Sequence, residues 1–327
     1  MRKLMIYGAT GYTGSMIVQH ALEAGLQIII AGRNQQKLAE MASEKNLPFR
    51  VFGLDDPDLI DTGLADIHAI INCAGPYMYT ARPLMEAAIR QKSHYMDVAA
   101  ELDSYQLAET LDKTAFEADV MLLPGCGGSV AMLGCLAAHA AATINKPVHI
   151  SLALNVTGTM SRGSVVSATE NVSTECLFRR KGHLLQRESS ELKDIDFGKG
   201  SQACFPVTLP DLITVWKATG IANIETFVHL TSEGFPQGDM ADLPDGPTVQ
   251  ERESNRYQAV AEIMNAEGNT LRLMLDTVNG YSFTAMAAAE AARRILAGES
   301  SPGFHTPAGL FGKEFAETIA DTQIREI

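Results

Sequence analysis

A short apolar segment that runs into three evenly spaced glycines is the feature that most constrains the fold. Residues 4–14 read LMIYGATGYTG, and an apolar helical pattern over Tyr12–Ala24 follows. This order of strand, tight turn and helix start is typical of the phosphate-binding turn of a Rossmann domain. We expect Gly8 to adopt the turn conformation, Gly11 to let a pyrophosphate approach the backbone, and Gly14 to bring the helix close to the strand.

The glycine turn and the loop that follows the fourth predicted strand together form the expected binding site of a dinucleotide. Backbone N–H groups at the start of a helix, and the helix dipole, both favour an anion at this position. A turn that serves only the packing of the chain is the alternative interpretation. The residues that we assign to cofactor binding on these grounds are Gly8, Thr10, Gly11, Tyr12, Thr13, Gly14, Cys73, Ala74 and Gly75.

Arg33 follows the second predicted strand, at the position that distinguishes the two nicotinamide dinucleotides. A cofactor with a free ribose 2′-hydroxyl usually meets Asp or Glu here, whereas a guanidinium can bind a 2′-phosphate through two hydrogen bonds. With Asn34 beside it and Lys37 one helical turn further on, Arg33 favours NADP(H) over NAD(H). The alternative is that Arg33 is a solvated residue before a helix that Asn34 caps.

Strand and helix patterns alternate over the first 124 residues, which predicts a parallel sheet covered by helices on both faces. The predicted strands are Lys3–Tyr7, Leu26–Ala31, Phe49–Phe52, Ala69–Cys73, Tyr95–Val98 and Val120–Leu123. The predicted helices are Tyr12–Ala24, Gln35–Lys45, Asp56–Gly63, Arg82–Gln91 and Ser104–Glu117. We therefore predict a Rossmann domain, a doubly wound parallel α/β sheet, over residues 1–124, with ligands at the carboxyl ends of its strands.

The pattern then changes to strands joined by tight turns, which predicts an α+β domain on a mixed or antiparallel sheet over residues 125–298. The expected elements are helices at Ala131–Ala142 and Tyr281–Leu296 and strands at His149–Val156, Ile213–Lys217, Glu225–Leu230, Tyr257–Asn265 and Thr270–Thr277. We interpret residues 159–200 as a helix followed by a polar linker. Ser232–Thr248 is interpreted as a long loop, of the kind that often covers a binding site.

Composition and charge exclude several classes of protein. The chain has 327 residues, 46% of them hydrophobic, and a net charge of −13, which argues against general nucleic-acid binding. No apolar run reaches the length of a bilayer span, so we expect no membrane partner. The five cysteines form no C-x-x-C pair and the histidines show no metal-ligand spacing. We therefore predict a cytoplasmic protein with reduced thiols and no metal.

Candidate acid–base groups follow the fourth and fifth predicted strands, beside the expected position of the nicotinamide. Tyr77 and Tyr79 follow the fourth strand, and a phenol can donate a proton to a carbonyl or imine as hydride arrives. Asp97 ends the fifth strand on the same face as Tyr95, and Glu101 comes after it. We name Tyr77, Asp97 and Glu101 as catalytic candidates and Tyr79 as a substrate contact. Packing of the tyrosines, and contact of Glu101 with a helix dipole, are the alternatives.

Two cations of the second domain are candidate substrate contacts. Arg162 lies in the stretch TGTMSRGS at 157–164, where backbone N–H groups and a guanidinium can bind a carboxylate. Lys217 follows the only tryptophan, Trp216, at the end of a predicted strand. A solvated surface cation is the alternative interpretation for each.

Eight motifs follow one another along nearly the whole chain: GATGYTG at 8–14, AGR at 31–33, NCAGPY at 72–77, HYMDVAAE at 94–101, PGCGG at 124–128, KATGIANIETF at 217–227, GYSFTAMAAAEAARRILAG at 280–298 and GFHTPAGLFGKEF at 303–315. In their order and spacing they resemble the saccharopine dehydrogenase-like oxidoreductases, a family that includes trans-acting enoyl reductases. The resemblance implies an NAD(P)-binding Rossmann domain, a second α/β domain, and a C-terminal segment, here residues 299–327, that returns to the first domain.

The resemblance does not imply one substrate. Related chains usually have glycine where this chain has Ala100, and often an acidic or aromatic residue shortly after the PGxG motif, where this chain has Gly128, Ser129 and Val130. Both departures lie where a substrate is expected, so no substrate is carried over from the family.

Together these features predict an NADP(H)-dependent oxidoreductase that transfers hydride to or from a C=O, C=N or C=C group of a small molecule in the cleft between the two domains. A non-catalytic NAD(P)-binding sensor or scaffold protein is the alternative, because the Tyr/Lys pair of the short-chain reductases is absent at Tyr77 and Tyr79. We further expect a homodimer through an open apolar face of the second domain's sheet.

Overall fold

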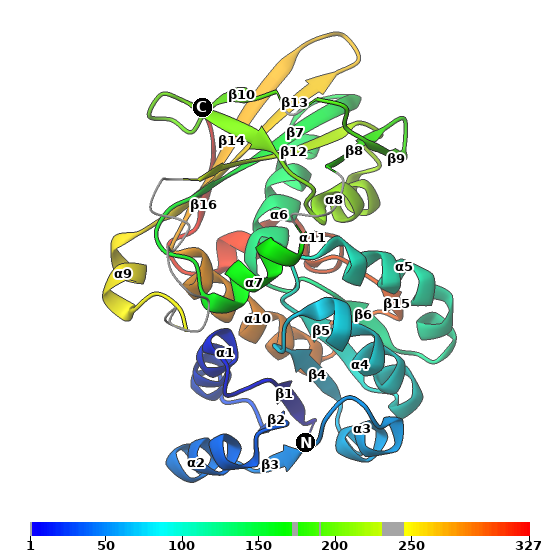
Figure 1. Ribbon diagram of the computed structural model, residues 1–327. Coiled ribbons are helices and arrows are strands. Elements are labelled where there is room, and N and C mark those ends of the chain that lie inside the picture. The colour runs from blue at the N-terminus through cyan, green and yellow to red at the C-terminus, as the bar shows by residue number, and fades with distance from the viewer. Residues whose placement is uncertain (1, 172–175, 190, 231–244) are drawn as a thin grey trace. The chain divides into compact units, whose positions relative to one another are not determined.

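The computed structural model describes residues 2–171, 176–189, 191–230 and 245–327 (Figure 1). The chain divides into two compact units. The first is formed by Met1–Gly128 with Thr284–His305, and the second by Ser129–Phe283 with Thr306–Ile327.

The first unit is built on a sheet of seven strands, all paired in parallel, in the order β15-β6-β5-β4-β1-β2-β3 (Figure 1). These strands are β1 (Leu4–Tyr7), β2 (Ile28–Gly32), β3 (Phe49–Val51), β4 (Ala69–Asn72), β5 (His94–Asp97), β6 (Met121–Leu123) and β15 (Gly303–Phe304). The order reverses between β1 and β4, as in a doubly wound Rossmann sheet, and ligands of such sheets bind outside the carboxyl ends of the strands at this point. The predicted fold class of this half is confirmed.

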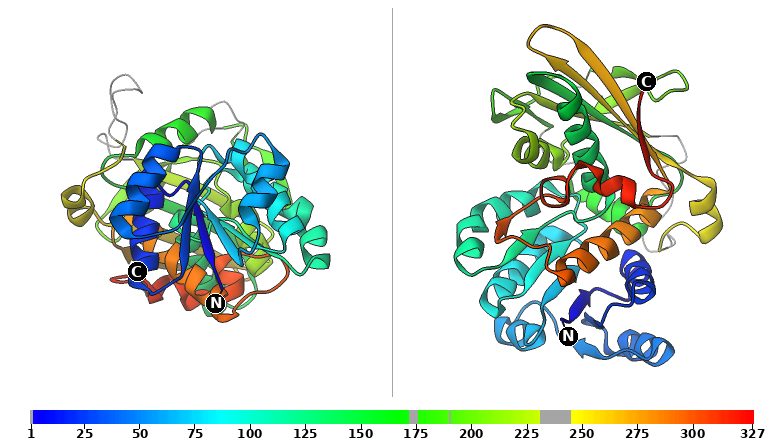
Figure 2. Two further views of the ribbon diagram at one scale, coloured as in Figure 1. Left: turned by 90° about the horizontal axis from the view of Figure 1, so that it is seen from below. Right: turned by 180° about the vertical axis from the view of Figure 1, so that it is seen from behind.

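Helices lie on both sides of this sheet (Figure 2). They are α1 (Tyr12–Glu23), α2 (Gln35–Lys45), α3 (Pro57–Leu64), α4 (Tyr77–Gln91), α5 (Leu102–Glu117) and the larger part of α10 (Gly280–Ala297). Cover from both sides explains why β1 is buried along its whole length: Leu4, Met5 and Ile6 are all fully buried.

The observed boundaries differ from the predicted division into 1–124 with 299–327 and 125–298. The alanine-rich helix α10 joins the first unit from Thr284 on, and a Cβ on Gly127 would lie 2.6 Å from the carbonyl oxygen of Thr284, so the two backbones touch. The C-terminal segment is shared between the units: β15 pairs with β6, whereas β16 (Gln323–Glu326) pairs with β14 in the second unit.

The second unit is built on a mixed sheet, as predicted, with the strand order β10-β11-β12-β7-β13-β14-β16 and the β8–β9 hairpin attached to β12. Only the β12–β7 pair of this path is parallel. Its strands besides β16 are β7 (Pro147–Val156), β8 (Leu177–Arg180), β9 (His183–Gln186), β10 (Lys193–Asp196), β11 (Ser201–Pro206), β12 (Ile224–Leu230), β13 (Tyr257–Asn265) and β14 (Thr270–Thr277). Its helices are α6 (Gly128–Thr143), α7 (Arg162–Asn171), α8 (Asp211–Thr219), α9 (Val249–Ser254), α11 (Pro307–Phe311) and the short 3-10 helix η1 (Lys313–Thr318).

Two predictions for this unit are wrong, and a third lies largely outside the described residues. The predicted strand Ile213–Lys217 lies within helix α8, which starts after Pro210 and ends at Gly220 in the left-handed conformation. The predicted linker within 159–200 contains β8, β9 and β10, because short strands with few apolar residues resemble a loop in sequence. The predicted loop Ser232–Thr248 lies outside the described residues up to position 244.

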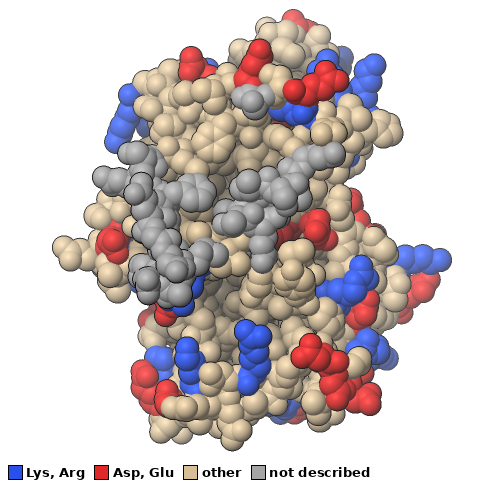
Figure 3. Space-filling view, in the orientation of Figure 1, with Lys and Arg blue, Asp and Glu red and all other residues tan. Residues whose placement is uncertain are grey.

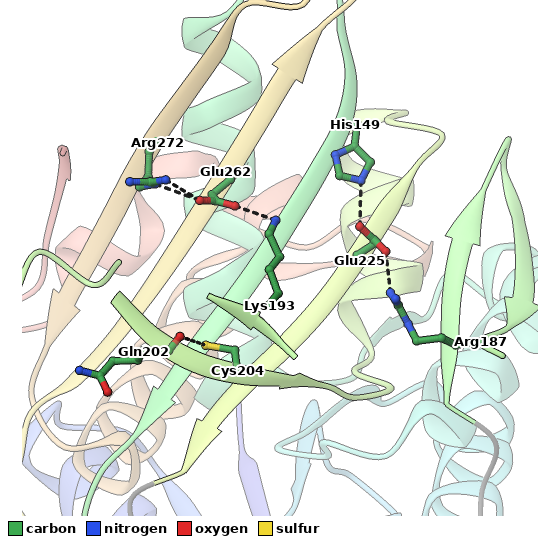
Figure 4. Close-up of polar contacts among 8 residues, drawn as sticks. All are labelled: His149, Arg187, Lys193, Gln202, Cys204, Glu225, Glu262 and Arg272. Atoms are coloured by element: carbon green, nitrogen blue, oxygen red, sulfur yellow. Dashed lines mark hydrogen bonds and ion pairs between the residues drawn. The ribbon is translucent and has the colours of Figure 1, made fainter. Parts of the chain in front are cut away.

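One side of the second sheet carries carboxylates paired with cations (Figure 4). Glu225 of β12 lies 3.2 Å from His149 and 2.6 Å from Arg187, and Glu262 of β13 forms a similar group with two further cations. Beside these ion pairs lies a buried apolar cluster, to which β10 contributes Ile195 and β11 contributes Cys204. Its members are Ala153, Ile195, Phe197, Cys204, Phe227, Val260 and Met274. The homodimer was predicted from an open apolar face of this sheet. The side of the sheet drawn in Figure 4 carries ion pairs instead, and the homodimer stays a prediction.

Candidate functional site

The glycine turn connects β1 to α1 with the geometry that its spacing predicts. Gly8 has a φ of +79°, in the left-handed region, and its N–H donates to the carbonyl of Ala31 at 2.8 Å. The Gly11 N–H donates to the carbonyl of Gly8 at 3.0 Å, and Gly11 is the N-cap residue of α1. No side chain caps this helix end, and no carboxylate of its first turn competes for the positive end of the helix dipole.

Close backbone contacts require glycine at two of the three positions. A Cβ on Gly14 would lie 2.3 Å from the carbonyl oxygen of Gly8, and a Cβ on Gly8 would lie 2.9 Å from the backbone nitrogen of Ala74. At Gly11 the nearest atom to such a Cβ is 3.3 Å away, so this position is less constrained by the protein itself. The turn, the start of α1 and the loop after β4 therefore form a cradle of backbone atoms that side chains would fill. Such a cradle fits a pyrophosphate.

The start of α2 carries the residues that the sequence assigns to the 2′-phosphate. Asn34 caps the helix, because its side-chain oxygen accepts the N–H of Lys37 at 3.0 Å. Within the described ranges, the exposed side chains of Arg33 and Lys37 take part in no ion pair. The charge of Arg33 also acts on Tyr7 at the end of β1: burial raises the pKa of Tyr7 to about 12, and Arg33 opposes this. Figure 3 shows a few separate basic side chains, with acidic ones beside them, on the lower part of the face that it draws.

The three catalytic candidates come together at the carboxyl ends of β4, β5 and β6. Tyr77 is the first residue of α4 and is buried, and the pKa of its phenol is raised well above the usual value by burial and by the nearby groups of Cys73, Asp97, Glu101 and Cys126. A phenol in this environment stays protonated in the physiological range. It can donate a hydrogen bond, and its raised pKa makes it a weaker acid than an ordinary phenol.

Asp97 and Glu101 occupy different positions in this group. Asp97 is fully buried at the end of β5, on the same face as Tyr95, as predicted. Burial raises its pKa to about 6, against hydrogen bonds that lower it. Glu101 is the N-cap residue of α5, and its carboxylate accepts the backbone N–H of Ala100 at 3.0 Å. Its catalytic role and the alternative, contact with the helix dipole, both stay predictions.

The other candidates lie apart from this group or in the second unit. Tyr79 is 64% exposed on α4, two residues beyond the buried Tyr77. In the second unit, Arg162 begins α7 and pairs with Asp245 at 3.2 Å, and Lys217 is exposed in the last turn of α8 rather than at a strand end. Their roles as substrate contacts stay predictions.

Sequence reasoning missed a groove of about 330 Å³ between α4 and α5, which Tyr77, Arg82, Ser104 and Thr110 help to line. Ser104 is 1% exposed, and its hydroxyl has no hydrogen-bond partner in the part of the chain that is described. The sequence offers one signal for Ser104, its position three residues after the N-cap residue Glu101. This signal is weak, because many serines lie at helix starts.

Two searches of the described residues complete this account. No group of three or more His, Cys, Asp or Glu side chains in those ranges is arranged to hold a metal ion. None of the described helices is both long enough and apolar enough to cross a membrane.

Comparisons with known proteins agree with this geometry. Residues 4–122 match the family model of the saccharopine dehydrogenase NADP binding domain. Over 106 residues the chain is 26% identical to a trans-acting enoyl reductase of Mycobacterium leprae, a match that covers 30% of this chain and 25% of that protein. The matched part is therefore about a quarter of the length of that curated relative.

Two solved structures share the fold over the whole chain. The saccharopine dehydrogenase (L-Glu forming) of Saccharomyces cerevisiae, in its apo form, gives a TM-score of 0.68 at 11% identity and covers 100% of both chains. The homospermidine synthase of Legionella pneumophila, in complex with NAD, gives 0.66 at 10% identity and covers 100% of this chain and 91% of that one. At these identities the likeness shows the fold alone. The predicted resemblance to the saccharopine dehydrogenase-like oxidoreductases is nevertheless confirmed, because residues 4–122 match that family model and the relatives and the fold agree with it.

Proposed function

We propose that the chain is an NADP(H)-dependent oxidoreductase that transfers hydride to or from a C=O, C=N or C=C group of a small molecule. The observation that carries this proposal is the backbone cradle at the β1–α1 turn, into which a Cβ on Gly14 would project to 2.3 Å from a carbonyl oxygen. Glycine at Gly8 and Gly14 keeps the turn and the start of α1 close together, so that the backbone N–H groups at this helix start can reach a pyrophosphate.

The preference for NADP(H) is supported by the charges at the start of α2. Arg33 and Lys37 are exposed cations beside a helix N-terminus, and the first turn of α2 contains no acidic residue. The carboxylate that would bind a free 2′-hydroxyl and repel a 2′-phosphate is therefore absent from this turn. The matching family model is also that of an NADP binding domain.

The chemistry follows from the groups at the carboxyl ends of β4, β5 and β6. When bound, the nicotinamide would supply or accept the hydride. The protonated phenol of Tyr77 is suited to donate a hydrogen bond to the oxygen or nitrogen of the acceptor group. The groove beside Tyr77 offers room for a part of the substrate that does not react.

Replacement of Arg33 by aspartate is expected to change the preferred cofactor. The substitution removes a charge-assisted contact to the 2′-phosphate and introduces repulsion, so we expect NADP⁺ to bind at least about 10-fold more weakly, with NAD⁺ changed by less than about 3-fold. Isothermal titration calorimetry with both nucleotides measures this. As a matched control, Lys113→Asp makes the same charge change at an exposed position on α5 and should alter neither affinity.

If Arg33→Asp leaves the ratio of the two affinities unchanged, Arg33 does not select the cofactor and the assignment to NADP(H) is wrong. A separate assay follows the oxidation of NADPH in the presence of keto, imino and enoyl compounds. Turnover with one class identifies the reaction. Tight binding of NADPH without turnover across all three classes would favour the alternative, a non-catalytic nucleotide sensor or scaffold.

A further inference from the structure

A chain of buried hydrogen bonds joins the ends of three neighbouring strands in the first unit. On β4, the side-chain amide of Asn72 donates to the hydroxyl of Tyr95 on β5 at 3.2 Å, and that hydroxyl donates to Asp97 Oδ2 at 2.9 Å. The other oxygen, Asp97 Oδ1, accepts the N–H of Gly125 after β6 at 2.8 Å and the N–H of Ala99 at 3.0 Å. Asn72, Tyr95 and Asp97 are all fully buried.

The same network reaches the loops that follow these strands. Asn72 Oδ1 accepts the N–H of Ala74, in the loop whose backbone touches Gly8 of the glycine turn. The carbonyl of Asp97 accepts the N–H of Cys126 at 2.8 Å, so the loop after β6 is held by both the side chain and the backbone of Asp97. The loops after β4, β5 and β6 are thus joined through one carboxylate.

Asp97 is poorly placed to exchange a proton with a substrate. Its side chain is fully buried, and three donors already occupy its two oxygens. A carboxylate that accepts two backbone N–H groups and a phenol is an anchor, and the free energy of burying its charge is recovered only through those hydrogen bonds.

We propose that Asp97 is a positioning residue rather than a proton donor: its ionised carboxylate, oriented by Tyr95, holds the loops after β5 and β6 in the form that receives the nicotinamide end of the cofactor. This inference rests on the proposed function. It removes Asp97 from the three catalytic candidates. Tyr77 stays the candidate that donates a hydrogen bond to the substrate.

Protonation of Asp97 would disturb the network at a defined point. A proton on Oδ2 makes this oxygen a donor toward Tyr95, whose own hydroxyl hydrogen then has no acceptor, because the Asn72 amide already donates to that oxygen. The titratable groups that act on Asp97 or feel its charge are Tyr95, Glu101, Tyr77, Cys73 and Cys126. Since burial raises the pKa of Asp97 to about 6, this disturbance falls in an accessible pH range.

The test is the pH dependence of NADP⁺ binding, measured by calorimetry between pH 5 and pH 8 in the wild type and three variants. Asp97→Asn imitates the protonated acid at every pH. Tyr95→Phe removes the hydrogen bond that favours the ionised form. Tyr105→Phe is the matched control, because its equally buried hydroxyl donates to the carbonyl of Ala99 at 2.6 Å and not to the carboxylate. The 2′-phosphate of NADP⁺ itself titrates near pH 6 and changes the affinity of every variant with pH. The affinity of each protein is therefore divided by that of Asp97→Asn at the same pH, which removes the effect of the phosphate.

We expect the wild type to bind NADP⁺ about 10-fold more tightly than Asp97→Asn at pH 8 and within about 2-fold of it at pH 5. In Tyr95→Phe the midpoint of this difference should move up by about one pH unit, and in Tyr105→Phe it should stay where it is in the wild type. A midpoint that moves equally in Tyr95→Phe and Tyr105→Phe, or a wild type that follows Asp97→Asn at all pH values, would overturn the inference.

Amide hydrogen exchange without nucleotide separates this inference from the proposed function. Protection of the peptide that contains Gly125, corrected for intrinsic exchange, should fall as the pH is lowered through about 6 in the wild type. In Tyr95→Phe the same fall should occur at a higher pH. If nucleotides do not bind but this protection shifts as expected, the network is real and the proposed function fails. If nucleotides bind and the protection does not change with pH, the inference about Asp97 fails.

Discussion

Replacing Gly14 by alanine is expected to abolish nucleotide binding and to destabilise the first unit. The new Cβ would lie 2.3 Å from the carbonyl oxygen of Gly8 and 3.0 Å from the Cα of Ala9. Both are backbone atoms, so relief requires α1 to move away from β1, and the amide groups of the turn move with it. Overpacking of this kind costs about 1–3 kcal/mol or more, and we expect NADP⁺ to bind more than about 100-fold more weakly.

Gly134→Ala is the matched control for this substitution. Gly134 is also a buried helical glycine, in α6, but a Cβ there would meet only the Cβ of Ala308 at 3.6 Å. Alanine is the better helix former, so this variant should be as stable as the wild type or up to about 1 kcal/mol more stable, with unchanged binding. Urea denaturation and calorimetry measure both properties. A Gly14→Ala protein that binds NADP⁺ like the wild type would show that the close packing of the turn does not serve the ligand.

Replacing Asp211 by asparagine is expected to stabilise the second unit increasingly as the pH rises. Asp211 is fully buried at the start of α8, and neither side-chain oxygen has a hydrogen-bond partner in the ranges that are described. Burial raises its pKa well above the usual value, so the folded protein holds the proton more tightly than the unfolded chain does. Stability from this group is therefore complete below the unfolded pKa and is lost as the pH rises toward the folded pKa.

Asparagine cannot ionise, so the variant lacks this loss. The two proteins should be similarly stable near pH 4. Above that, the variant should gain about 1.4 kcal/mol for each pH unit in which the unfolded acid is ionised and the buried acid is still protonated. Denaturation by urea at a series of pH values between 4 and 8 gives the difference in the free energy of unfolding.

Thr214→Val provides the control, because the hydroxyl of Thr214 is buried one turn later on α8 and is also without a partner within the described chain. This isosteric change should stabilise the protein by about 1 kcal/mol at every pH, since no proton is involved. A gain for Asp211→Asn that is equally independent of pH would mean that Asp211 is not protonated in the folded protein.

The Rossmann half was largely predictable because its signals are local. Strands β1 and β2 are buried along their whole length, and helix α2 begins at Gln35 and ends at Lys45 as predicted, with Asn34 as its cap. The glycine turn was equally readable, because the steric needs of Gly8 and Gly14 arise within a few residues of sequence. Local consistency of this kind is what a single sequence expresses best.

The second half was harder to predict because its structure depends on contacts that are distant in sequence. In α8 the run Ile213–Lys217 contains β-branched residues that favour a strand, yet the helix is set by its start after Pro210, its end at Gly220 and the burial of Leu212 and Val215. In the short strands β8 to β10, pairing with β12 and β11 decides the structure rather than composition.

The candidate site shows the same limit. The carboxyl ends of β4 and β5 were located from the pattern of strands, and Tyr77, Asp97 and Glu101 are indeed grouped there. What the sequence did not reveal is that Asn72 and Tyr95 join Asp97 across two strands, because a hydrogen bond between side chains on neighbouring strands leaves no periodic signal. The burial that makes Asp97 an anchor is likewise a property of the fold.

The central claim is that a pyridine nucleotide binds across the β1–α1 turn of this chain, and an equilibrium titration of the wild-type protein with NADPH and NADH, followed by nicotinamide fluorescence, tests it most directly. The account predicts saturable binding of one nucleotide per chain, with NADPH bound at least about 10-fold more tightly than NADH. Absence of saturable binding for both nucleotides would contradict it.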